Sequence, residues 1–203
     1  MENSIQIIEK PDRVSWDEIH EAIWESHADN RQKGIIMAFP SLPGEEIRKK
    51  IGDAGKMFVA MDGEKVVGTY AVIVKSNSKL WFIRSNYGYL CFMSILPDYR
   101  GKGVYRLLTE KCEGYAAQKD LSVLTFDTHE RNLKIQKLKE REGFILVSYK
   151  ACKDHYNVVM AKWLQPCTFS SWYIRLRFHL SKLYLKTRFK MISEKGRVKR
   201  FGL

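Results

Sequence analysis

The sequence predicts an α/β fold, in which a mixed central sheet is flanked by helices and followed by a basic C-terminal extension. Three observations support this class. Short apolar runs of strand length alternate with stretches whose apolar residues recur at helical spacing. Asp62-Gly63 separates two apolar runs, a pattern typical of a β-hairpin. The uncharged run 87–96 leads through Arg-Gly-Lys-Gly into a helix-like stretch.

The helices are expected from their apolar spacing and their end signals. Ser15 and Glu18 match a capping box, so the first helix should begin there. Gly143 is expected to cap the last helix. The predicted helices cover residues 16–27, 43–51, 104–119 and 130–142. The predicted strands cover residues 5–8 at a sheet edge, 57–61, 66–74, 87–96, 122–128, 144–151 and 157–164.

The turn before the third helix has the chemistry of an anion site. Unpaired N–H groups in the first turn of a helix attract anions, and Gly101 and Gly103 let an anion approach the backbone. Arg100 and Lys102 add positive charge. The stretch therefore predicts a diphosphate site, with a basic loop containing two turn glycines as the alternative.

Several other classes are excluded by the same residues. A dinucleotide fingerprint would need glycine at Arg106, and a P-loop would need Ser or Thr at Gly103. The longest uncharged run, residues 85–97, is too short to span a bilayer. The four cysteines lack C-x-x-C spacing, so we expect reduced thiols and no metal site. Without the apolar core of a signal peptide at the N-terminus, a cytoplasmic location is expected.

The positive charge is concentrated at the C-terminal end. Of the net charge of +12, residues 165–203 contribute +9, with ten Lys or Arg and one acid, Glu194. We therefore predict a domain over 1–164 and a basic, aromatic-rich extension over 165–203. Residues 172–180 alternate as in a strand, whereas the pattern from Leu180 onward is closer to a helix, and neither pattern clearly predominates.

In element order and in two motifs, residues 4–164 resemble the GNAT superfamily of acyl-CoA-dependent N-acetyltransferases. The family's CoA-pyrophosphate loop has the pattern R/Q-x-x-G-x-G/A, which corresponds to residues 100–105. Arg100 and Gly103 match this pattern, while Tyr105 stands where the family has Gly or Ala.

The second motif, N-x-x-A-x-x-L-Y-x-x-x-G-F, corresponds to residues 132–144. Its matching positions are Asn132, Leu138, Gly143 and Phe144. Ile135 replaces the family's Ala, and Lys139 replaces its Tyr. The two motifs in the correct element order indicate a GNAT-like fold more strongly than either motif alone.

The resemblance implies that acetyl-CoA is the cosubstrate and that the sheet is splayed beside the strand that leads into the glycine turn. The pantetheine arm would pair with the backbone of that strand, and Asn132 would hydrogen-bond the arm. Core packing is the alternative for the strand's side chains, and a turn or cap role is the alternative for Asn132. The cofactor-binding residues implied are Met93, Ile95, Arg100, Gly101, Lys102, Gly103, Val104 and Asn132.

Acetyl transfer to an amine requires positioning, an oxyanion donor and proton transfer. Lys139 is the candidate proton donor to the thiolate, with a solvated helix position as the alternative. His129 is the candidate base, with an ordinary exposed loop histidine as the alternative. The chemistry needs no metal.

We therefore expect an acetyl-CoA-dependent N-acetyltransferase whose acceptor is a small amine or an amino sugar of the cell envelope. A non-catalytic CoA-binding module of the same fold is the alternative, and an enzyme whose tail binds RNA is a third hypothesis. For residues 170–200 we favour an anionic membrane surface over nucleic acid, which would place the protein at the inner face of the membrane. Packing on a second subunit, as in a homodimer, is the remaining alternative for the tail.

Overall fold

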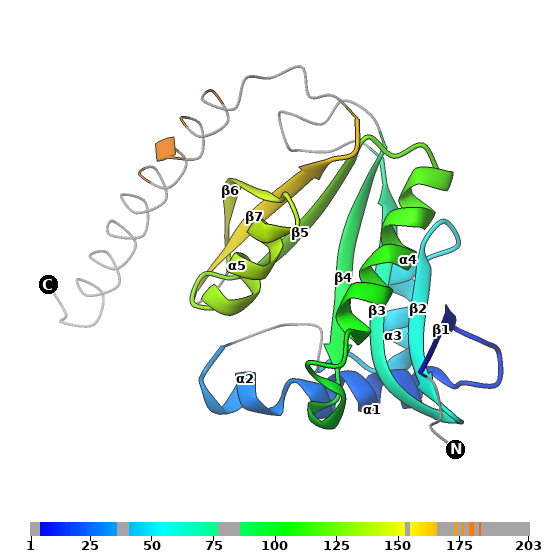
Figure 1. Ribbon diagram of the computed structural model, residues 1–203. Coiled ribbons are helices and arrows are strands. Elements are labelled where there is room, and N and C mark those ends of the chain that lie inside the picture. The colour runs from blue at the N-terminus through cyan, green and yellow to red at the C-terminus, as the bar shows by residue number, and fades with distance from the viewer. Residues whose placement is uncertain are drawn as a thin grey trace, which may run out of the picture. The chain divides into compact units, whose positions relative to one another are not determined.

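The computed structural model describes residues 5–35, 41–76, 86–152 and 155–165, together with five positions of the C-terminal extension. Seven strands form one mixed sheet in the order β1-β2-β3-β4-β5-β7-β6, and helices flank it (Figure 1). The predicted α/β class is confirmed. β1 lies at an edge and β4, the strand before the glycine turn, lies in the middle of the order, as expected.

The element bounds agree with the sequence predictions apart from two differences. The strands are β1 (Gln6–Glu9), β2 (Lys56–Asp62), β3 (Lys65–Lys75), β4 (Tyr87–Ile95), β5 (Val123–His129), β6 (Ile145–Ala151) and β7 (Tyr156–Trp163). The helices are α1 (Trp16–Ser26), α2 (Ala28–Gln32), α3 (Gly44–Ile51), α4 (Val104–Gln118) and α5 (Leu133–Arg141). The short α2 was not predicted. α5 begins later than predicted because β5 continues to His129, and the N–H of Asn132 bonds the carbonyl of His129 at 2.9 Å in the turn between them.

The chain divides into two compact units, which are described separately below. The first contains residues 1–126 and 163–165, and the second contains residues 127–162 and 166–203. The boundary therefore falls within β5.

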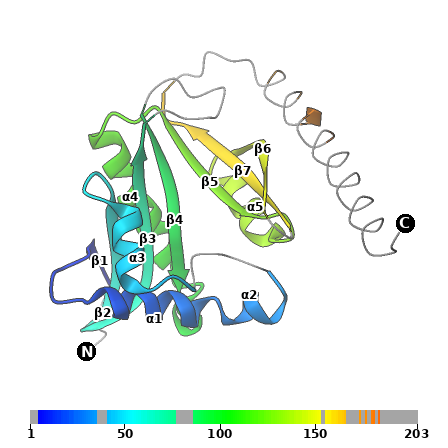
Figure 2. The same ribbon diagram turned by 180° about the vertical axis from the view of Figure 1, so that it is seen from behind.

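In the first unit, β3 lies between β2 and β4 and pairs antiparallel with both. α4 covers one face of these strands, while α1 and α3 cover the other (Figures 1 and 2). β3 is buried along almost its whole length, because it is covered on both faces. β3 therefore resembles a strand that is covered on both faces of its sheet, rather than a strand with one face open to solvent.

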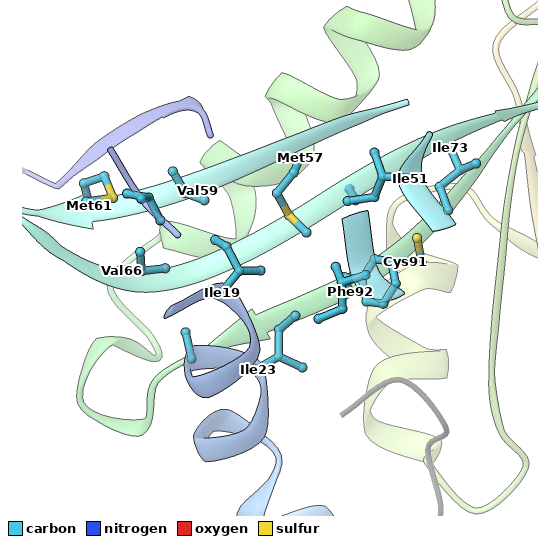
Figure 3. Packing of buried hydrophobic residues seen from close by; sticks show 14 residues of the cluster. Ile19, Ile23, Ile51, Met57, Val59, Met61, Val66, Ile73, Cys91 and Phe92 are labelled. Carbon is cyan, nitrogen blue, oxygen red and sulfur yellow. The ribbon is translucent and has the colours of Figure 1, made fainter. Parts of the chain in front are cut away.

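One face of this sheet forms a core with α1 and α3. Ile19 and Ile23 of α1 and Met57 of β2 point into the same apolar cluster as Phe92 of β4 (Figure 3). Burying an Ile or Phe side chain contributes about 1.5–3 kcal/mol, so this face holds α1 firmly against the strands. The C-terminal end of α1 is thereby fixed near β4.

Two predicted turns and caps in this unit are confirmed. The Ser15 hydroxyl accepts from the N–H of Glu18 at 3.1 Å, and the Glu18 carboxylate accepts from the N–H of Ser15 at 2.7 Å. Asp62 pairs with Lys65 across the hairpin, which leaves a two-residue loop. Gly63, with φ of 60°, takes its first position, where a left-handed conformation favours glycine.

In the second unit, β6 and β7 pair antiparallel, and α5 ends in a Schellman motif. The N–H of Phe144 bonds the carbonyl of Lys139 at 3.0 Å, and the N–H of Gly143 bonds the carbonyl of Glu140 at 3.1 Å. Gly143 has φ of 87°, which confirms its predicted role at the helix end.

Five positions of the extension are described, and all are helical: Tyr173, Leu176, His179, Leu180 and Leu183. The sequence left both a strand and a helix pattern open for the extension, and the helix is the one found at Tyr173 and Leu176. Alternation had suggested a strand, but Leu176, Leu180 and Leu183 also follow helical spacing. Among the described residues, no helix has both the length and the apolarity needed to cross a membrane.

Candidate active site

The glycine turn connects the end of β4 to α4 through a single 3-10 turn, Pro97–Tyr99. Gly101 and Gly103 have φ of 77° and 81°, in the left-handed region that favours glycine. A Cβ built at either position would meet no described atom within 4 Å. The turn therefore needs glycine for its backbone, and the space beside it is open to a ligand.

The two basic residues of the turn contact other groups of the protein. Arg100 donates from Nε to the carbonyl of Ile95 at 3.2 Å and forms an ion pair with Asp29 at 2.8 Å. The Nζ of Lys102 lies 5.2 Å from the centre of the Tyr99 ring. Arg100 thus shapes the turn through its contacts within the protein. Lys102 directly follows Gly101, the first of the two left-handed glycines.

The residues that begin α4 are packed against the sheet. Val104 is buried, as a core position should be. Tyr105, which stands where the family has a small residue, has its ring centre 6.4 Å from that of Tyr70 of β3. Its hydroxyl is buried, so the bulky side chain is accommodated by packing on β3 rather than by filling the space over the glycines.

β4 contains a bulge at the level of the expected pantetheine site. Ala71 pairs with Cys91, but Thr69 pairs with Ser94, so β4 carries one extra residue. Phe92 lies in this bulge and has φ of 56°, which is uncommon for a non-glycine residue. The Thr69 hydroxyl donates to the carbonyl of Phe92 at 2.6 Å and fixes the distorted backbone.

The bulged end of β4 lies beyond its pairing with β5. The parallel register joins Gly88–Leu90 to Leu124–Phe126, whereas β4 continues to Ile95. The loss of pairing agrees with the splay that the family resemblance predicted. The carbonyls of Met93 and Ile95, both predicted to bind pantetheine, already accept hydrogen bonds from His27 and Arg100.

His27 is a residue that the sequence analysis did not identify as functional. Its Nε2 lies 3.0 Å from the Met93 carbonyl, and its Nδ1 lies 2.9 Å from the Asn30 amide nitrogen. Burial is the main cause that lowers the pKa of His27 to about 4, and the nearby Arg100 and Arg31 also lower it. The signal in the sequence that could have identified it is the helical spacing, which places His27, a polar residue, on the apolar face of α1.

In the second unit, His129 is buried, so the alternative of an exposed loop histidine is wrong. Its Nδ1 accepts from the N–H of Arg131 at 3.0 Å, and its ring stacks on His155 at 4.5 Å. Burial, and then the neighbouring His155, lower the pKa of His129. Because Nδ1 accepts a hydrogen bond, the neutral ring carries its proton on Nε2 and presents a donor there. This geometry disfavours the predicted role as base.

Asn132 occupies the N-cap position of α5, but its side chain makes no capping hydrogen bond. The Asn132 amide instead donates to the Thr128 hydroxyl at 3.3 Å. The side chain is therefore held at the end of β5, beside the start of α5, while the residue itself lies in the turn and at the cap position that the alternative reading expected.

Lys139 is fully buried, so its predicted alternative as a solvated helix position is wrong. Its Nζ forms an ion pair with Glu142 at 2.8 Å and lies 4.9 Å from the centre of the Phe144 ring. Burying an ammonium group is costly unless it is paired, which explains the nearby carboxylate. The helix presents Lys139 and Ile135, one turn apart, on the same buried side.

A metal centre is not apparent in the described part of the chain, where no group of three or more ligating side chains occurs. The residues instead fit a CoA diphosphate. The two glycines provide the open approach, and α4 provides the helix N-terminus that attracts phosphate.

Comparisons with known proteins bear on the family and the fold of the chain. The model of the acetyltransferase (GNAT) family matches residues 16–144. A comparison with curated proteins finds no match. Among solved structures, a GNAT-family acetyltransferase from Staphylococcus aureus Mu50 shares 18% identity at a TM-score of 0.64, covering 80% of this chain and 100% of the other.

Two further structures with the same fold have known activities or ligands. The ribosomal-protein-S18-alanine N-acetyltransferase from Escherichia coli shares 15% identity at a TM-score of 0.59, covering 82% of this chain and 99% of the other. The NatC complex, solved with Gag peptide and CoA, matches at 13% identity and a TM-score of 0.61, covering 79% of this chain and 99% of the other. At these identities the structures show a common fold, and the match to the family model over most of the chain establishes that this protein belongs to the GNAT family of acetyltransferases.

Proposed function

We propose that the protein transfers an acetyl group from acetyl-CoA to the nitrogen of an amine. The observation that carries this proposal is the glycine turn, with two left-handed glycines and open space at the N-terminus of α4. Family membership supports acyl transfer in general. Acetyl-CoA, when bound, supplies the activated thioester.

The glycine turn, the first turn of α4 and the end of β4 each have a role in this reaction. Backbone N–H groups of the glycine turn and the first turn of α4 bind the pyrophosphate, and Lys102 adds positive charge. The bulged end of β4 binds the pantetheine and offers an N–H to the developing oxyanion. The neutral amine nitrogen attacks the thioester carbon, the ammonium nitrogen of the tetrahedral intermediate loses a proton to solvent, and the C–S bond breaks to release the CoA thiolate and the amide.

Lys139 is proposed as the donor that protonates the departing thiolate. Its place in the second motif, where the family has Tyr, supports this role, and Glu142 holds the buried Nζ at 2.8 Å. His129 has a different role from the predicted base: its Nε2–H can donate to a carbonyl of the acceptor or of the pantetheine. Asn132 is proposed to bond the pantetheine.

The proposed acceptor is a small amine or an amino sugar of the cell envelope. Free thiol release from acetyl-CoA, measured against a panel of such amines, tests the activity directly. Release that depends on one amine, together with an acetylated product seen by mass spectrometry, would support the proposal. CoA binding without thiol release across the panel would favour a non-catalytic CoA-binding module instead.

The C-terminal extension is proposed to bind an anionic membrane surface, which would place the protein at the inner face of the membrane. Leu176, Leu180 and Leu183 are 45%, 54% and 62% exposed, and their spacing puts them on one side of a helix. The sequence around them carries ten basic residues and one acid. Exposed leucines with abundant positive charge suit a lipid surface better than phosphate contacts alone.

A further inference from the structure

Three carbonyls in the bulged end of β4 accept hydrogen bonds from side chains. Thr69 donates to Phe92 at 2.6 Å, and the Nε of Arg100 donates to Ile95 at 3.2 Å. Between them, Nε2 of His27 lies 3.0 Å from the carbonyl of Met93. A bulge disrupts the regular ladder, so its buried carbonyls need other donors.

The contacts of His27 define one chemical form of its ring. A carbonyl oxygen can only accept, so Nε2 must carry the hydrogen that bonds Met93. Nδ1 then has a free electron pair, which accepts from the Asn30 amide at 2.9 Å. Both nitrogens are therefore satisfied by the neutral Nε2–H tautomer, in a residue that is only 6% exposed.

His27 also lies at a structural junction, because it is the single residue between α1 and α2. Arg100 of the glycine turn bonds both sides of this junction. Its Nη2 donates to the carbonyl of Ser26 at 2.6 Å, and its Nη1 pairs with Asp29 at 2.8 Å. One short segment of chain thus contacts both the bulged strand and the glycine turn.

We propose that His27 is a positioning residue for acyl transfer, which fixes the bulged end of β4 and, through its junction with Arg100, the glycine turn. This inference rests on the proposed function. The thioester and the diphosphate of one CoA molecule must fit both places at once, so a shared anchor keeps them in register. Small displacements at such a site cost large factors in rate and affinity.

The charges around the junction agree with a neutral ring. Arg31 and Arg100 both disfavour protonation of His27, while Asp29 is paired with Arg100. The junction therefore keeps its tautomer throughout the neutral pH range.

The test compares His27→Leu with His27→Gln, whose amide nitrogen can still donate to Met93. Calorimetric titration with CoA should show about tenfold weaker binding in His27→Leu, as expected for one lost buried hydrogen bond, and near wild-type binding in His27→Gln. With acetyl-CoA, kcat should fall in His27→Leu and recover in His27→Gln. His20→Leu is the matched control in the same helix, because His20 stacks on Trp24 and should leave CoA binding unchanged.

Two further measurements keep the proposal testable if His27→Leu does not fold. NMR of 15N-histidine protein should show a neutral Nε2–H histidine whose signal is absent from His27→Gln. Asn30→Leu should weaken CoA binding in the same direction, by a smaller factor. Wild-type CoA affinity in a folded His27→Leu, or the opposite tautomer in the spectrum, would overturn the positioning role. If the wild-type protein itself bound no CoA, the proposed function would fail first.

Discussion

The buried lysine of α5, Lys139, is the residue whose proposed role distinguishes catalysis from CoA binding alone. Lys139→Met keeps the length of the side chain and removes its charge; because Glu142 then loses its partner, the variant should be less stable, and its fold is checked by circular dichroism before turnover is compared. If Lys139 protonates the thiolate, kcat for thiol release should fall about 100-fold, the lower range for a lost general acid. Lys139→Tyr restores the family's residue and should retain turnover.

The matched control for this prediction is Lys137→Met, which changes an exposed position of the same helix. Turnover and CoA affinity should stay as in the wild type. Equal turnover in Lys139→Met and the wild type would show that Lys139 is structural and that the proton donor lies elsewhere.

His27 gives the protein a specific dependence of stability on pH. Its pKa is about 4 in the folded protein and about 6.5 in the unfolded chain, so between these values the unfolded chain binds more protons. The contribution is fully present above pH 6.5 and is lost as the pH falls toward 4, by roughly 3 kcal/mol in total. Denaturant unfolding of wild type and His27→Gln should therefore give free energies whose difference changes over that interval. A difference that is constant from pH 7 to 4 would contradict the buried neutral histidine.

At the scale of single residues, backbone conformations could be predicted from the sequence more successfully than side-chain contacts. Gly101 and Gly103 could be recognised because a tight turn into a helix needs their conformations. The burial of Lys139 was missed because its sequence neighbours are charged, although its spacing from Ile135 marks the buried side of the helix. The contact between His27 and Met93 joins residues 66 positions apart, so only the tertiary fold brings them together.

Among the elements, α1 has the most clearly defined start, and it carries His27 at its other end. Ser15→Ala removes one half of the capping box and should lower the free energy of unfolding by about 1 kcal/mol. Ser15→Asp can still accept from the N–H of Glu18 and should remain close to wild type. Urea unfolding measures both, and an unchanged midpoint in Ser15→Ala would show that the cap contributes nothing to α1.

The element predictions failed mainly where two elements meet. The sequence predicted a strand ending at residue 128 and a helix beginning at residue 130, yet β5 extends to His129 and the helix starts at Leu133. Likewise α2 was missed, because four of its five residues are polar and they show no apolar period. In both cases tertiary contacts set the boundary, which local patterns do not record.

For the whole molecule, the sequence predicted the sheet class and its central strand because apolar runs and turn signals alternate regularly. It did not predict that the chain divides into two units within β5. This division depends on packing between residues far apart in the chain, which the sequence of one strand does not reveal.

The extension makes a separate prediction for the whole protein. Full-length protein should sediment with anionic vesicles, and binding should weaken with salt, since each basic residue near the surface contributes about 1 kcal/mol that salt screens. Replacing Leu176, Leu180 and Leu183 by Ser should remove the part of the binding that persists at high salt. Equal sedimentation of both proteins at high salt, or no binding to anionic vesicles at all, would exclude the membrane proposal for this helix.

The central claim is that CoA binds at the glycine turn, and calorimetric titration of CoA into Gly103→Asp tests it most directly. Gly34→Asp is the matched control, because Gly34 also has a positive φ and open space around it. Both substitutions carry similar backbone strain, of roughly 1–2 kcal/mol, and both add one negative charge. We predict that the wild type and Gly34→Asp bind CoA alike, whereas Gly103→Asp, still folded by circular dichroism, loses the binding. Wild-type affinity in Gly103→Asp would contradict the account.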